Sequence, residues 1–440
     1  MTTKQAKLTK QETSWILYDV ANSAFTMVLT ASIPVFFRAL VDGDALENVV
    51  NNPLVKLISS GNISAALAGS EQAYEAIKSS LFAAMTVVST VVVAVLAPIL
   101  GAIADHRNMK KRLFTLALLL GVCGLLSLGI TTNWMAYLLL LFLARIGYSS
   151  CNVFYDSMLT DVTTDERMDN VSALGFAWGY IGSCVPFIIG IVLILKAESF
   201  GIGTGLATQL SFIITAIWWI AFTIPLLKNV KQVHYRDDKL EVGKIFGRLL
   251  ETLKKISKNK KLFLYIIAYF CYIDGVYTII SMATTYGSEV GLGQTDMILA
   301  LLLTQFVAFP FAILTGKLAQ KYNPLLLIRG FICIYIFACV FGFFLQYAWQ
   351  FWVLAVTIGL AQGGIQALSR SYYGKLIPKK ESNEYFGFFD IFGKFADFFG
   401  PMIMGLSASL LGASKYGILA LSALFIIGFV LLMFVQKIAD

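Results

Sequence analysis

The chain has 440 residues, of which 58% are hydrophobic and only 14% are charged. A soluble domain carries about a quarter charged residues, so this composition excludes an ordinary soluble protein. Apolar runs longer than about eighteen residues recur along the chain and indicate a helical membrane protein. A membrane-spanning barrel is excluded, because its segments of about ten residues with alternating polarity are not seen.

Twelve apolar segments predict an all-α integral membrane protein with twelve transmembrane helices. The first six are expected at residues 14–40, 79–104, 112–132, 134–158, 171–195 and 207–227. The last six are expected at residues 262–286, 295–319, 325–345, 351–376, 385–410 and 416–436. Two connections are long: the polar segment 41–78, which we interpret as an external cap, and the basic segment 228–261.

Basic residues gather on one side of the predicted membrane. The N-terminal tail, the loops that follow even-numbered spans and the C-terminal tail hold 26 of the 34 Lys and Arg residues. The opposite loops hold four, namely Lys56, Lys78, Lys196 and Lys415. Because cytoplasmic loops are enriched in basic residues, both termini are predicted to be cytoplasmic. The net charge of +8 is explained by this topology and does not indicate nucleic-acid binding.

Weak internal repetition divides the chain into two six-helix halves. Gly101 and Gly316, like Pro186 and Pro401, lie 215 residues apart in corresponding spans. We therefore predict an N-terminal half at 1–227, a cytoplasmic linker at 228–261 and a C-terminal half at 262–440. The linker is expected to be a solvated tether or, over residues 239–257, an amphipathic helix on anionic headgroups.

Charged residues inside predicted spans are the main candidates for function, because a charge near the bilayer centre costs about 2.5–3.5 kcal/mol. Asp390, Lys394 and Asp397 share one helix face, which must therefore contact other helices or water. Depths counted at about 1.5 Å per residue give two charged layers. The midplane layer comprises Arg145, Asp274, Lys394 and Asp397, and the cytoplasmic layer comprises Asp19, Asp156, Arg370 and Asp390.

The midplane layer is predicted to bind a solute and protons. The Arg145 guanidinium can hold a carboxylate, Asp274 can hold an ammonium group, and Asp274 or Asp397 can carry a proton. The uncharged polar candidates at useful depth are Asn22, Gln305 and Gln362. The cytoplasmic layer is predicted to form a gate between the halves. In both layers the alternative is a set of ion pairs that only brace the helices.

Enzyme and metal chemistry are disfavoured by the distribution of reactive residues. The six cysteines lie in predicted spans without close paired spacing, and the two histidines lie in loops. No nucleophile–histidine pair and no set of metal ligands falls within the spans. We therefore expect a protein that is not an enzyme and that has no metal or cofactor.

The loop after the second span carries a motif that resembles the major facilitator superfamily. In this motif a glycine, Gly101, precedes an acidic residue, Asp105, and the basic residues Arg107, Lys110 and Lys111. The glycine admits a neighbouring helix, and the acid can cap the N-terminus of a facing helix. Asn108 stands where the superfamily has a further glycine, and asparagine tolerates the left-handed backbone that this turn needs.

Two longer strings resemble the autophagy-related vacuolar amino-acid effluxer family, including its bacterial members. The first is Ser14-Trp-Ile-Leu-Tyr-Asp-Val-Ala-Asn-Ser-Ala-Phe25. The second has two parts, from Gln366 to Ser371 and from Phe386 to Lys394. The resemblance implies efflux of amino acids from a storage compartment in fungi. The short loops are typical of a bacterial member, which would lie in the inner membrane.

The sequence thus predicts a secondary transporter that moves a small polar or zwitterionic solute by alternating access. We expect efflux, proton coupling and a monomer that contacts membrane lipids. One alternative is export of drugs or amphipathic lipids, although the Gly-Pro motif of drug antiporters is missing from the fifth span, where Pro186 follows Val185. The other is a membrane sensor that transports nothing.

Overall fold

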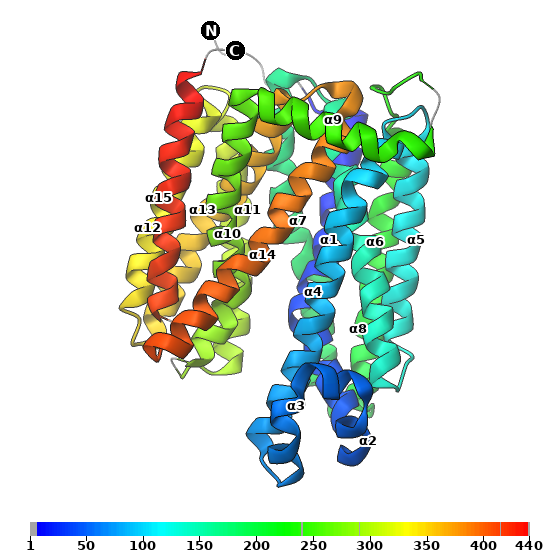
Figure 1. Ribbon diagram of the computed structural model, residues 1–440, viewed down its shortest axis with the longest axis vertical. Helices are drawn as coiled ribbons and strands as arrows, with labels where there is room; N and C mark the ends of the chain where they lie inside the picture. The colour runs from blue at the N-terminus through cyan, green and yellow to red at the C-terminus, as the bar shows by residue number, and fades with distance from the viewer. Residues whose placement is uncertain (1–6, 239–240, 290, 414, 439–440) are drawn as a thin grey trace.

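The computed structural model describes residues 7–238, 241–289, 291–413 and 415–438 as a bundle of long α-helices (Figure 1). The N-terminal helices are α1 (Lys10–Asp42), α2 (Leu46–Asn51), α3 (Pro53–Leu67), α4 (Glu71–Ala104), α5 (Met109–Leu128), α6 (Trp134–Val162), α7 (Asp165–Leu195) and α8 (Thr204–Asn229). They are followed by α9 (Ile245–Lys258), α10 (Lys260–Glu289), α11 (Gln294–Leu318), α12 (Pro324–Phe343), α13 (Ala348–Leu376), α14 (Ser382–Leu411) and α15 (Lys415–Lys437). Three short 3-10 turns complete the regular structure of the described residues: η1 (Glu198–Phe200), η2 (Val242–Lys244) and η3 (Lys379–Glu381).

Polar side chains fix where several helices begin. Thr9 and Glu12 form a reciprocal capping box at the start of α1. Asn133 accepts hydrogen bonds from two backbone N–H groups of α6, and Asn323 caps α12 immediately before Pro324. These side chains satisfy amide groups that have no partner within the helix.

Eleven helices in the described part of the chain are long and apolar enough to cross a membrane, namely α1, α4, α5, α6, α7, α8, α10, α11, α12, α13 and α15. Each contains or overlaps one of the segments expected from the sequence. The span expected at 385–410 falls in α14, a helix of 30 residues that is not among the eleven. The charges of Asp390 and Lys394, which mark this helix as a candidate for function, also lower its apolar character. The described residues thus form an all-helical structure whose long apolar helices are suited to a membrane.

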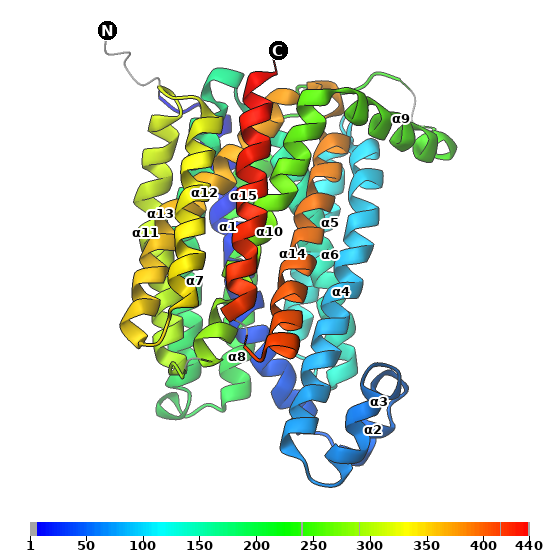
Figure 2. The same cartoon turned by 60° about the vertical axis from the view of Figure 1, so that its left-hand side comes forward.

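The two long polar connections lie at opposite ends of the bundle. Helix α9 lies across one end, where α15 also finishes, and α2 and α3 project beyond the other (Figures 1 and 2). The amphipathic helix expected at 239–257 corresponds to α9, and the cap expected at 41–78 corresponds to α2, α3 and the first turns of α4.

Buried apolar side chains form two clusters that divide near the linker. The first extends from Trp15 to Val230, and the second comprises residues from Ile245 to Val435 together with Ala102 of α4. Across this division α4 packs against α14, α7 packs against α11, and α13 packs against α6 and α7. These three seams join the two clusters.

Candidate functional site

Arg370 of α13 lies at the centre of a buried ionic cluster. Its Nη1 donates to Asp156 Oδ1 of α6 at 2.9 Å, and its Nη2 lies 3.4 Å from Asp19 Oδ2 of α1. Its Nε donates to the hydroxyl of Ser172 on α7 at 3.0 Å. The arginine is 4% exposed, and the side chains of Asp19 and Asp156 are 7% and 29% exposed, so the pair with Asp19 is the more shielded from water. Three of the four residues predicted for the cytoplasmic gate are thus in direct contact.

Aromatic rings enclose the same guanidinium. Its central carbon lies 4.4 Å from the ring centroid of Phe176, 4.7 Å from that of Trp15 and 5.3 Å from that of Tyr155. The Tyr155 hydroxyl donates to Asp19 Oδ2 at 2.7 Å. The cation–π contacts stabilise the positive charge of Arg370, and the hydrogen bond from Tyr155 stabilises the negative charge of Asp19, in a place with little water. Sequence reasoning did not predict these rings as partners of the arginine.

Asp390, the fourth predicted gate residue, lies on α14 and is half-buried. Its negative charge acts on the carboxyl group of Asp156. It therefore belongs to the electrostatic surroundings of the Arg370 cluster.

A second set of polar contacts joins α7 and α13 nearer to the loops. Asp169 accepts from the Ser371 hydroxyl and from Lys375 Nζ, each at 2.6 Å. The Ser172 hydroxyl donates to the carbonyl of Ala367 at 2.8 Å. Asp169 and Lys375 were missed in the sequence because both lie beside loops, where charges are expected to be solvated.

The loop motif joins α4 to the start of α14. Asp105, at the end of α4, accepts from the backbone and side-chain amides of Asn383 at 2.9 and 2.8 Å, and from the Glu384 amide at 3.1 Å. A Cβ on Gly101 would lie 2.8 Å from the carbonyl carbon of Asn383, so only glycine permits this approach. The structure thus shows the helix contact and the helix cap that the motif predicts.

The basic residues of the motif have individual partners. Lys110 is buried and pairs with Asp161 of α6 at 2.6 Å, while its Nζ lies 3.3 Å from the Ser382 hydroxyl. Lys111 donates to the Val230 carbonyl, and Arg107 lies over the Tyr235 ring. The turn residue Asn108 has φ +62°, the left-handed conformation expected for it.

The repeated copy of the motif makes a related contact without the charge. Gly316 of α11 lies against Asn170 of α7, where an added Cβ would be 2.9 Å from the asparagine Oδ1. Gln320, at the position equivalent to Asp105, is exposed. The two glycines therefore permit close helix approach at two seams, and a buried acid follows only the first.

The linker supplies an arginine that the sequence did not predict as functional. Arg248 Nε of α9 lies 2.8 Å from Glu384 Oε2, and its Nη2 lies 3.6 Å from Asp105 Oδ2. Both carboxyl groups are buried. A cation from the linker therefore lies over the contact between α4 and α14.

Burial raises the pKa of Asp105 to about 7, although the hydrogen bonds from Asn383 and the nearby Lys110 act in the opposite direction. The charged groups around it are Lys110, Arg248 and Glu384. A carboxyl group whose pKa is raised by burial holds its proton more tightly when the contact is closed. This stabilising effect is complete below the ordinary value of 3.8 and is lost as the pH rises to about 7.

We therefore predict that the α4–α14 contact is closed in more molecules at about pH 5 than at about pH 8. Spin labels at Arg112→Cys and Lys380→Cys, with the exposed Cys123 and Cys333 replaced by serine, would report the separation of the two halves at the end that carries α9. The Asp105→Asn variant should show a smaller change with pH. An equal change in both proteins would assign the effect to other groups.

The predicted midplane residues come from three helices, α6, α10 and α14. Asp274 of α10 is 2% exposed and accepts from the backbone amide of Gly400 at 2.9 Å. Arg145 of α6 donates to the Ser89 hydroxyl at 3.0 Å, and Lys394 of α14 is half-buried. The Asp397 side chain lies outside the described residues. Their predicted pairing and their role in binding stay predictions.

The uncharged candidates include two buried amide oxygens without a hydrogen-bond partner in the described structure, Asn22 Oδ1 of α1 and Gln305 Oε1 of α11. Gln305 Nε2 lies 3.6 Å from Met27 Sδ, so α11 contacts α1 at this level. Gln362 of α13 is 6% exposed. A buried carbonyl oxygen without a donor is costly, and a bound N–H or O–H group would satisfy it.

Known proteins of one family match nearly the whole chain. The family model described as "Vacuole effluxer Atg22 like" matches residues 8–438. The chain belongs to the Atg22-like family. A relative from Bacillus subtilis, described as an uncharacterized MFS-type transporter, YxiO, is 42% identical over 438 residues, which cover 98% of this chain and 96% of the relative. Autophagy-related protein 22 of Yarrowia lipolytica is 26% identical over 54% of this chain and 45% of its own length.

Solved structures establish the fold of this Atg22-like chain. The human organic anion transporter MFSD10 superposes with a TM-score of 0.72 at 13% identity, covering 96% of this chain and 99% of that one. The transporter FucP in its outward conformation superposes with a TM-score of 0.67 at 14% identity, covering 97% of each chain. These superpositions show the major facilitator fold, and the Atg22-like family together with the MFS-type relative supports a membrane transporter and points away from an enzyme.

Proposed function

We propose that this Atg22-like chain is a secondary transporter whose two six-helix halves, 1–227 and 262–440, alternate around a central site. The proposal takes α14 as the twelfth span and the end that carries α9 as cytoplasmic. The observation that carries it is that ionic and polar contacts cross the seams between the two apolar clusters at this end. Asp19 and Asp156 contact Arg370 there, and Asp105 contacts α14. Such contacts can be exchanged for water when the halves separate, whereas a continuous apolar core cannot.

The solute we propose is a small zwitterion such as an amino acid, exported across a bacterial plasma membrane and coupled to protons. Arg145 would hold its carboxylate, and Asp274 its ammonium group. The unpaired Asn22 and Gln305 oxygens would accept from the same ammonium group. Lys394 and Asp397 of α14 complete the charge balance, and Asp274 or Asp397 would carry the proton.

We predict that Asp274→Asn and Arg145→Gln each lower amino-acid transport at least about tenfold, a change that corresponds to about 1.4 kcal/mol. Removing a buried charge that contacts substrate typically costs more than this. Transport would be measured in proteoliposomes with an imposed pH gradient. The matched control is Lys56→Gln, an exposed lysine of α3, which should transport normally. Undiminished transport in both variants and in Asp397→Asn would contradict the proposed site.

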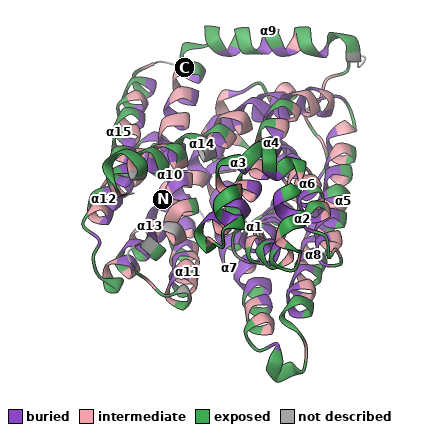
Figure 3. Cartoon of the chain, turned by 60° about the horizontal axis from the view of Figure 1, so that its bottom comes forward, coloured by how far each residue is buried: buried purple, intermediate pink, exposed green. Residues whose placement is uncertain are grey.

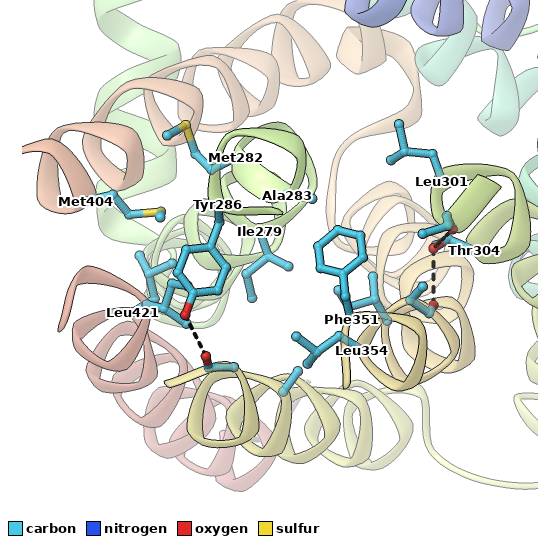
Figure 4. A pocket seen from close by; sticks show the side chains of 16 residues that line it. Ile279, Met282, Ala283, Tyr286, Leu301, Thr304, Phe351, Leu354, Met404 and Leu421 are labelled. Carbon is cyan, nitrogen blue, oxygen red and sulfur yellow. Dashed lines mark hydrogen bonds between the residues drawn. The ribbon is translucent and has the colours of Figure 1, made fainter. Parts of the chain in front are cut away.

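A second candidate function, export of amphipathic compounds, is favoured by an apolar cavity in the C-terminal half (Figure 4). The residues around it come from α10 to α15. Its hydroxyl groups are occupied, since Tyr286 donates to the Gly342 carbonyl and Thr304 to the carbonyls of Ala300 and Ala355. Such a lining selects apolar ligands over zwitterions.

One variant distinguishes the two candidate functions. Ala355→Trp would place a large side chain in the cavity, which neither Arg145 nor Asp274 lines. Export of a lipophilic dye should fall in this variant if the cavity takes the substrate, and amino-acid transport should be retained. The opposite pattern would remove the second candidate.

A further inference from the structure

Helix α9 has three different faces, and only one of them packs against the bundle. Its buried face comprises Ile245, Leu249, Thr252 and Ile256, which pack toward α4 and α10. About a quarter turn away lies an exposed apolar stripe of Phe246, Leu250 and Leu253, which are 69%, 67% and 42% exposed. The remaining surface is polar and includes the exposed lysines Lys254 and Lys258.

The position of the helix explains why such a stripe is tolerated. Helix α9 lies across the ends of the spans at the edge of the bundle, and its outer surface is largely exposed (Figures 1 and 3). One residue, Asn259, separates it from α10. Helix α10 begins at Lys260 and is long and apolar enough to cross a membrane. A helix at this height and edge lies next to the boundary between headgroups and acyl chains.

The charge of the region identifies the surface that this helix fits. Lys254, Lys258, Lys260 and Lys261 lie within eight residues at the end of α9 and the start of α10, and Lys244 precedes α9. An apolar stripe beside a lysine-rich surface is the pattern of helices that lie in an anionic membrane interface. Glu251 is the one acidic residue within α9.

We propose that α9 is an interfacial helix that inserts Phe246, Leu250 and Leu253 among acyl chains and binds anionic phospholipid headgroups through its lysines. The same helix carries Arg248, which contacts Glu384 and Asp105 across the α4–α14 seam. Membrane binding therefore holds Arg248 over this seam and favours its closed form. The lipid contact itself does not require the proposed transport function.

The first test measures the depth of the helix in the full-length protein. Leu250→Cys, labelled with a polarity-sensitive fluorophore, is compared with Glu251→Cys on the polar face. Cys123, Cys271 and Cys333, which are not buried, are replaced by serine. In vesicles of phosphatidylcholine and phosphatidylglycerol, the label at 250 should be quenched by brominated acyl chains at least about twofold more than the label at 251. Equal quenching at both positions would overturn the insertion.

The second test concerns the headgroups and uses exposed lysines, whose substitution leaves the core intact. Quenching of the label at 250 should increase when phosphatidylglycerol is added to phosphatidylcholine vesicles. In a Lys254→Gln/Lys258→Gln variant this increase should be at least halved. An unchanged increase would overturn the role of these lysines, and no increase in the parent protein would overturn anionic binding. Both readouts are independent of transport, so a failure of the proposed substrate would leave them unaffected.

Discussion

Arg370→Gln is expected to give a protein that unfolds at a clearly lower temperature and whose two halves no longer close at the end that carries α9. The variant leaves the buried carboxyl group of Asp19 and the half-buried carboxyl group of Asp156 without their cation, since the guanidinium lies 3.4 and 2.9 Å from them. Breaking a buried ion pair by removing one partner costs roughly 3–5 kcal/mol. The loss of the aromatic contacts of the guanidinium adds to this cost.

The measurement is thermal unfolding in detergent, followed by the distance between spin labels at positions 112 and 380. The matched control is Lys379→Gln, which removes a half-exposed pair with Asp165 at 3.0 Å and should cost no more than about 1 kcal/mol. The triple variant Asp19→Asn, Asp156→Asn, Arg370→Gln should recover much of the stability, because no uncompensated charge stays buried. Equal melting temperatures for Arg370→Gln and the control would contradict a structural role for the cluster.

The helical architecture could be predicted from sequence because each span is specified locally. A run of about twenty apolar residues must satisfy its backbone within one helix when water is absent, whatever its neighbours are. The ends were less exact: the span expected at 112–132 belongs to α5, which begins at Met109 and ends at Leu128. Helix ends depend on local turns, such as the left-handed turn at Asn108 before α5, and hydropathy does not report these.

The candidate site was predictable only in part, because its contacts join residues far apart in the chain. Arg370 and Asp156 could be paired from their equivalent places in the two halves. The contact of Arg370 with Phe176 and that of Ser371 with Asp169 could not be predicted, because the packing of α7 against α13 decides which side chains meet. Arg248 was missed for another reason: a basic residue in a loop satisfies the positive-inside rule and gives no sign of a buried acid beside it.

The last prediction concerns the closest helix contact of the motif. Gly101→Leu is expected to force α4 and α14 apart at the end that carries α9, because even a Cβ would lie 2.8 Å from the carbonyl carbon of Asn383 and 3.0 Å from the Cα of Glu384. Those atoms are backbone and cannot rotate away. Leucine is a better helix former than glycine by up to about 1 kcal/mol, so any loss of stability must come from the contact and not from the helix itself.

The matched control is Gly405→Leu on α14, where an added Cβ meets nothing within 4 Å. Both variants gain the same helix propensity, and only Gly101→Leu meets a neighbouring backbone. Overpacking costs typically about 1–3 kcal/mol, which would reduce the closed population about fivefold or more. The distance between labels at 112 and 380 should therefore lengthen in Gly101→Leu and stay unchanged in Gly405→Leu. Unchanged distances in both would show that the α4–α14 approach does not control closure at this end.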